Sequence, residues 1–158
     1  MVIGGIYTQL RHLEDEKLGA AFMREFGNRT TSDIDLLTTE PQKMRKELTD
    51  YDEDGRLEAD VVGPDLIDHT QEIVGEGYQA HITAFREEEQ PLEAQVQLPS
   101  DTHGFYTKIH TPSAASQEGT NQDAVLMAKS PKYSIEASKI TAMTRGEPEA
   151  RKYAASLL

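Results

Sequence analysis

The amino-acid sequence predicts an α+β protein. Apolar residues at helical spacing mark both ends of the chain, and alternation of apolar and polar residues marks its middle. Clusters rich in proline, glycine, aspartate and serine separate the alternating segments. With 158 residues, of which 37% are hydrophobic, we expect a single domain over residues 1–158. The expected order is a helical N-terminal part (1–49), an acidic loop (50–63), a β-rich part (64–143) and a C-terminal helix (144–158).

Three helices are expected. Apolar residues recur every three or four positions over residues 8–26, which predicts an amphipathic N-terminal helix. The string Thr39-Glu40-Pro41-Gln42 is typical of a capping box and predicts a short second helix over 40–49. A second capping-box string, Thr144-Arg145-Gly146-Glu147, precedes the C-terminal helix.

The strands are expected to form a mostly antiparallel region over about residues 70–143. Alternation or β-favouring composition indicates them, and the expected ranges are 70–85, 92–98, 104–111, 123–129 and 132–143. Residues 112–122 contain no large apolar side chain and are expected to form a mobile loop that serves as a contact surface.

Charge and composition exclude several functions. The net charge is −12, and residues 40–101 alone hold seventeen acidic against five basic residues, which disfavours wrapping around nucleic acid. The absence of cysteine excludes disulfides and thiolate metal sites. The sequence has no membrane-spanning apolar run and no classical signal peptide, so we expect a cytoplasmic or virion location and no membrane partner.

An acidic string resembles half of an EF-hand calcium loop. The candidate ligands are Asp50, Asp52, Asp54 and Glu58. Gly55 occupies the turn position of such a loop, but Val61 stands where a bidentate glutamate belongs. Calcium is therefore expected to bind with about millimolar affinity at best, and a plain acidic turn is the alternative.

A second string, Ala80-His81-Ile82-Thr83, resembles one half of the active site of the 2H phosphoesterases. In that family two His-x-Thr motifs face each other, and the resemblance implies that His81 exchanges protons while Thr83 holds a phosphate. His110 is the candidate for the second histidine, although Pro112 stands where its hydroxyl partner belongs. The alternative is a structural histidine, half-buried on a sheet face.

The five histidines supply another candidate metal site. They are His12, His69, His81, His103 and His110. His103 and His110 would be neighbours if their segment were a strand, but no compact ligand spacing is present.

No complete catalytic constellation is present in the sequence, and we find neither a phosphate-binding loop nor a nucleophile elbow. The composition therefore favours a non-catalytic assembly subunit that contacts other protein subunits in a homo- or hetero-oligomer, such as a virus or phage structural component. Two alternatives stay open. One is a small phosphoesterase built on His81, and the other is an acidic inhibitor that mimics nucleic acid.

Overall fold

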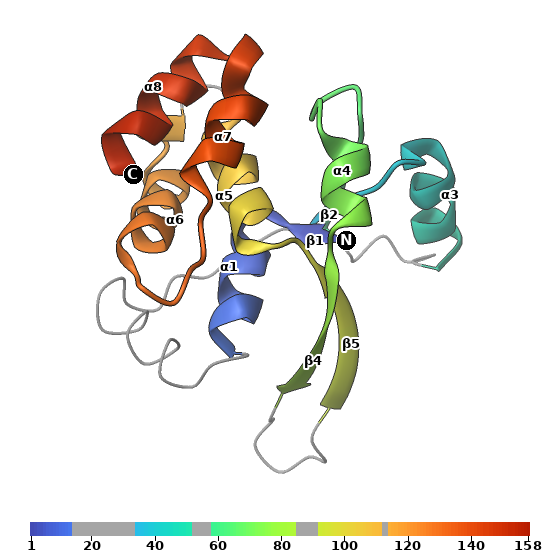
Figure 1. The fold of residues 1–158 in the computed structure, drawn as a ribbon. Helices are drawn as coiled ribbons and strands as arrows, with labels where there is room; N and C mark the ends of the chain where they lie inside the picture. Colours follow the sequence, from blue (N-terminus) through green and yellow to red (C-terminus); the bar gives the residue numbers. More distant parts are fainter. Residues whose placement is uncertain (14–33, 52–57, 85–91, 112–113) are drawn as a thin grey trace.

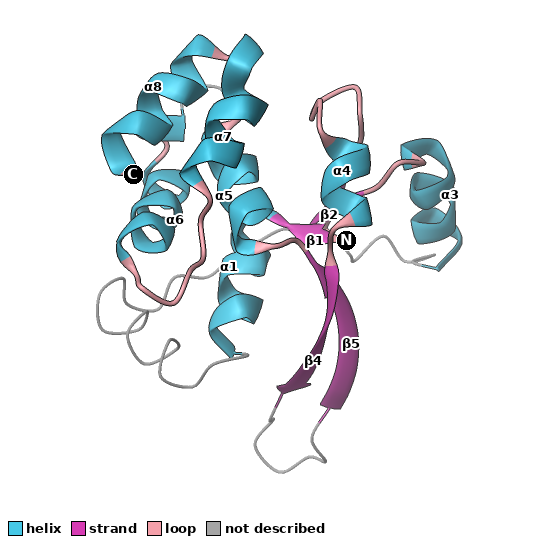
Figure 2. Ribbon diagram, in the orientation of Figure 1, coloured by secondary structure: helices cyan, strands magenta, loops and turns pink. Residues whose placement is uncertain are grey.

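The computed structural model describes residues 1–13, 34–51, 58–84, 92–111 and 114–158. A small three-stranded sheet lies between helices, and a two-stranded ribbon projects away from the body (Figures 1 and 2). Helices and small sheets coexist without regular alternation along a parallel sheet, so the predicted α+β class is confirmed.

The three-stranded sheet has the order β1 (Val2–Ile3), β2 (Ile34–Leu37) and β3 (Ala59–Val62). β1 pairs antiparallel with β2, and β2 pairs parallel with β3. None of these strands was predicted, and the acidic loop predicted over 50–63 is wrong at its two ends, where α3 continues to Tyr51 and β3 spans Ala59–Val62. Runs of two to four residues are too short to show a period of two.

The helices are α1 (Gly4–Leu13), α3 (Pro41–Tyr51), α4 (Thr70–Gly75), α5 (Asp101–Ile109), α6 (Glu118–Lys129), α7 (Ala137–Met143) and α8 (Pro148–Leu157). α3 confirms the second expected helix, and α8 confirms the C-terminal one. The expected N-terminal helix over 8–26 overlaps α1, and its remainder lies outside the described residues. None of the helices in the described part of the chain is long and apolar enough to cross a bilayer.

The ribbon consists of β4 (Tyr78–Ala84) and β5 (Leu92–Leu98). They pair antiparallel from Tyr78 opposite Leu98 to Ala84 opposite Leu92. β5 has the predicted bounds, because its apolar residues alternate over seven positions. The strand predicted over 70–85 is correct only in its second half, since residues 70–75 form α4.

The strands predicted over 104–111, 123–129 and 132–143 are wrong. These segments belong largely to α5, α6 and α7. The predicted loop over 112–122 is wrong as well, because a 3-10 turn spans Ala114–Ser116 and α6 begins at Glu118. The core therefore holds helices in the part of the chain where strands were expected.

The sequence pattern does not reveal helix α5, because this helix is buried on every side. All of its residues from Thr102 to Ile109 are buried, so it presents no polar stripe. Its aromatic and β-branched residues favour a strand by propensity, and tertiary packing overrides that preference. The side chain of Ser100 caps the helix by accepting a hydrogen bond from the backbone N–H of His103 at 3.3 Å.

Gly104 allows α5 to approach α1 closely. A Cβ at this position would collide with the ring of Tyr7, which is fully buried and has no room to move. We expect Gly104→Ala to lower the free energy of unfolding by about 1–3 kcal/mol through overpacking. Urea denaturation measures the change. Gly75→Ala is the matched control, since a Cβ there meets no atom within 4 Å. Equal stabilities of the two variants would contradict this account of the α1–α5 contact.

Candidate functional site

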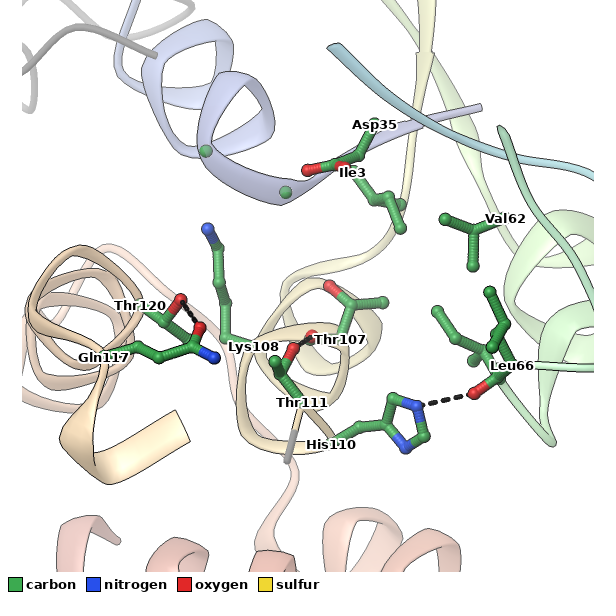
Figure 3. A pocket seen from close by; sticks show the side chains of 13 residues that line it. Ile3, Asp35, Val62, Leu66, Thr107, Lys108, His110, Thr111, Gln117 and Thr120 are labelled. Carbon is green, nitrogen blue, oxygen red and sulfur yellow. Dashed lines mark hydrogen bonds between the residues drawn. The ribbon is translucent and has the colours of Figure 1, made fainter. Parts of the chain in front are cut away.

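A cleft of about 530 Å³ opens between the N-terminal end of α1, the sheet, α5 and α6. Its volume lies in the range of small-molecule sites, which is about 300–1,000 Å³. Its polar lining comes mainly from Gly4, Gly5, Asp35, Thr107, Lys108 and Thr111. Asp35 and Lys108 extend from different elements toward the beginning of α1, which is drawn in pale blue in Figure 3.

The turn from β1 into α1 is built from two glycines. Gly4 has a φ of +70°, a left-handed conformation that L side chains rarely adopt. A Cβ on Gly4 would also collide with the carboxylate of Asp35. The glycine therefore lets an acidic side chain on β2 reach the first turn of the helix. The first N–H groups of an α-helix have no partner within it and carry a partial positive charge, so this end of the cleft favours a negative charge, and the carboxylate of Asp35 lies there.

Two carboxylates share one face of the sheet. Asp35 on β2 is the register partner of Asp60 on the parallel strand β3. Register partners point to the same face, and adjacent strands are about 4.8 Å apart. Val62 lies on this same face, two residues after Asp60, and lines the cleft. Asp60 itself is exposed at the edge of the face. Such a pair of carboxylates is a donor set for Mg²⁺ or Mn²⁺.

A buried cation faces the carboxylates. Lys108 on α5 is 4% exposed and lines the cleft. Its Nζ lies 2.5 Å from Oδ2 of Asp123 on α6, which is also buried. The pair is nearly neutral as a unit, and the ammonium carries three donor protons. The lysine is therefore fixed in position at the wall of the cleft.

His110 closes the cleft at the end of α5. Its Nε2 donates to the carbonyl oxygen of Leu66 at 2.7 Å, and its Nδ1 lies 3.3 Å from Oε1 of Glu147. The ring is therefore held between a backbone carbonyl and a carboxylate. The same carboxylate oxygen accepts a hydrogen bond from the hydroxyl of Tyr106 at 2.7 Å. Burial and this bond to Glu147 raise the pKa of Tyr106. Both ring nitrogens of His110 are thus directed at protein acceptors, which fixes the ring at the wall of the cleft.

The structure separates the two histidines of the His-x-Thr prediction. His81 lies on the projecting ribbon and is exposed, so the expectation of a half-buried histidine is wrong. Thr83 belongs to the same strand, β4. His110 lies at the end of a helix rather than on a strand, so the facing-strand arrangement of the 2H phosphoesterases is not formed by this pair.

The candidate calcium loop lies largely outside the described residues. Asp50 is exposed near the end of α3, and Glu58 is exposed just before β3. Asp52 and Asp54 fall in the part that is not described. The calcium site over 50–61 stays a prediction.

Sequence reasoning missed the residues that form the cleft. Two signals could have found them. Gly4 and Gly5 follow an apolar pair and precede a helical pattern, which is the composition of a phosphate-binding turn. An aspartate also interrupts the apolar run Ile34-Asp35-Leu36-Leu37. A charge inside an apolar run is unusual in a buried segment.

Comparisons with protein-family models, curated proteins and solved structures find no match to this chain, so its function is inferred from the geometry of the cleft.

Proposed function

We propose that the protein is a divalent-cation-dependent nucleotidyltransferase that binds a nucleoside triphosphate in the cleft. One observation carries the proposal: the carboxylate of Asp35 lies against the side-chain-free Gly4 at the beginning of α1, with Asp60 in register beside it. This arrangement puts cation ligands next to a phosphate-binding helix terminus, which a triphosphate with its metal ions requires.

The two ends of the cleft suit different parts of the ligand. The N–H groups at Gly4 and Gly5 and the ammonium of Lys108 suit the terminal phosphates, which carry most of the negative charge. The carboxylates of Asp35 and Asp60 would hold metal ions, and such ions would neutralise charge on the oxygens of the phosphate nearer the nucleoside. Paired ions of this kind stabilise both the attacking and the leaving oxygen of an in-line displacement. This division favours reaction at the α-phosphorus over reaction at the γ-phosphorus.

The reaction balances as a substitution at phosphorus. The hydroxyl oxygen of an acceptor forms a bond to the α-phosphorus, and the bond from that phosphorus to the bridging oxygen breaks. Pyrophosphate leaves with the bonding electron pair, while the helix terminus and Lys108 stabilise its charge. The hydroxyl proton passes to water.

The experiment follows a radiolabel. The protein is incubated with Mg²⁺ or Mn²⁺ and with nucleoside triphosphates labelled at either the α- or the γ-phosphate. The acceptor probes are a protein rich in serine and tyrosine hydroxyls and an RNA with a free 3′-hydroxyl. We expect α-label on the acceptor and release of pyrophosphate. Transfer of the γ-label would replace the proposal with phosphoryl transfer, and absence of both labels from every acceptor would refute it.

The role as an assembly subunit stays a prediction. Tyr51, Leu66 and Leu158 are the exposed large hydrophobic residues in the part that the structure describes. They lie on different elements, and no specific observation favours a particular protein partner, a virion location or mimicry of nucleic acid.

A further inference from the structure

A second group of ligand-type side chains lies away from the cleft, where α4, α5 and α7 meet. Glu72 lies in the first turn of α4, Glu76 follows the last residue of α4, and His103 comes from the first turn of α5. One ligand atom from each of the three lies within 4.8 Å of the others. We refer to these three residues as the Glu72–His103 cluster.

His103 lacks a hydrogen-bond partner. Its side chain is fully buried, yet neither ring nitrogen makes a hydrogen bond. Its Nε2 points into the cluster and lies 3.6 Å from Oε1 of Glu72. Buried polar groups in native proteins are nearly always satisfied, so an unpartnered imidazole that faces carboxylates indicates a missing ligand.

The ammonium of Lys139, on α7, contacts both carboxylates of the cluster, where a bound cation would lie. Its Nζ lies 3.1 Å from Oε1 of Glu72 and 2.7 Å from Oε2 of Glu76. His69 also approaches, with Nδ1 3.4 Å from Oε2 of Glu72. The two carboxylates are thus already assembled around one positive charge. Because Lys139 is long and partly exposed, its ammonium can move into solvent when another cation replaces it.

The protonation states suit metal binding. Burial and the charge of Lys139 lower the pKa of His103, which keeps the ring neutral with a lone pair on one nitrogen. The hydrogen bond from Lys139 lowers the pKa of Glu72, which keeps that carboxylate ionised. A neutral imidazole and two carboxylates form a donor set for a first-row transition metal.

We propose that the Glu72–His103 cluster is a zinc site, with Nε2 of His103 and one carboxylate oxygen each of Glu72 and Glu76 as ligands. Three protein ligands leave the fourth tetrahedral position for water, as in open zinc sites. The imidazole nitrogen and the small ligand number favour Zn²⁺ over Mg²⁺ and Ca²⁺, which take six or more oxygen ligands.

One ligand of the cluster borders a cavity. Glu76 and Lys139 line a cavity of about 360 Å³ together with Thr102 and Glu136. The Glu76 side chain is 53% exposed, so a metal ion can reach this ligand from solvent. Bound zinc would connect the end of α4 to the start of α5 and would stabilise the folded state by mass action.

The test is a calorimetric titration of metal-free protein with ZnCl₂, repeated with MgCl₂. We expect one equivalent of Zn²⁺ to bind, no detectable Mg²⁺ binding at this cluster, and a rise in the melting temperature with zinc. His103→Ala should weaken zinc binding by at least about tenfold, since even residues outside the ligand set typically change metal affinity by 10–100-fold. Lys139→Met should strengthen it, because the competing ammonium is removed.

His81→Ala is the matched control, because His81 is an exposed histidine on the ribbon. If His103→Ala fails to fold, Glu76→Gln replaces it, since the Glu76 side chain is 53% exposed. Zinc binding that is unchanged in both ligand variants, or weakened equally by His81→Ala, would overturn the proposal. A wild-type protein that binds no zinc at millimolar concentration, with Lys139→Met equally inert, would overturn it as well.

Discussion

Asp35→Asn is expected to reduce nucleotidyl transfer by at least about 100-fold. The amide keeps the shape of the side chain but removes the negative charge that holds the metal ion, and loss of a single preorganised electrostatic group typically reduces kcat 10²–10³-fold. The fold should survive, because Asp35 is only partly buried at the rim of the cleft. Initial rates of α-label transfer at saturating Mg²⁺ measure the effect.

Gly4→Ala should produce a comparable loss for a different reason. The added Cβ requires a positive φ that alanine disfavours, and it displaces the carboxylate of Asp35 from the helix terminus. Glu47→Gln is the matched control for Asp35→Asn, since Glu47 is an exposed acid on α3. Full activity of Asp35→Asn would show that the cleft carboxylates do not bind the metal.

Lys108→Met is expected to lower the free energy of unfolding by about 3–5 kcal/mol. Lys108 and Asp123 have side chains that are only 5% and 1% exposed, so removal of the ammonium leaves a buried carboxylate without its ion-pair partner. The double variant Lys108→Met/Asp123→Leu should recover most of the lost stability, because an apolar pair needs no compensating charge. Urea denaturation of the single and double variants measures both quantities.

An exposed ion pair provides the control for this measurement. Lys43 and Glu40 lie 3.7 Å apart with side chains 64% and 68% exposed. Lys43→Met should therefore change stability by no more than about 0.5 kcal/mol. If Lys108→Met were as stable as Lys43→Met, the buried pair would not hold α5 against α6, and the position of Lys108 in the cleft would need another explanation.

The elements that the sequence predicted well are those with one face in water. α3 carries a strong start signal at Thr39–Gln42, and β5 alternates over its whole length. The buried helix α5 has neither property, because tertiary contacts on all sides determine its conformation. The strands of the small sheet have only two to four residues, which are too few to show a clear alternation. Burial and length thus explain where the pattern-based predictions were wrong.

The candidate site was harder to predict than the fold. Gly4, Asp35 and Lys108 are far apart in sequence and meet only because β2 lies beside β1 and α5 packs on α1. Asp33 lies two residues before Asp35 in the sequence, but it is outside the described residues. Short continuous motifs in the sequence instead suggested His81 and Asp52 as site residues. A site assembled from separate elements has no such motif.

Amide shifts in a nuclear magnetic resonance titration test the central claim most directly. Uniformly ¹⁵N-labelled protein is titrated with ATP, with and without Mg²⁺. The proposed function predicts the largest shifts at the amides of Gly4, Gly5 and Asp35, and these shifts should depend on Mg²⁺. Residues 78–82 of the ribbon serve as the internal reference. Shifts confined to the ribbon, or no shifts at millimolar nucleotide and Mg²⁺, would contradict the assignment of the cleft as a nucleotide site.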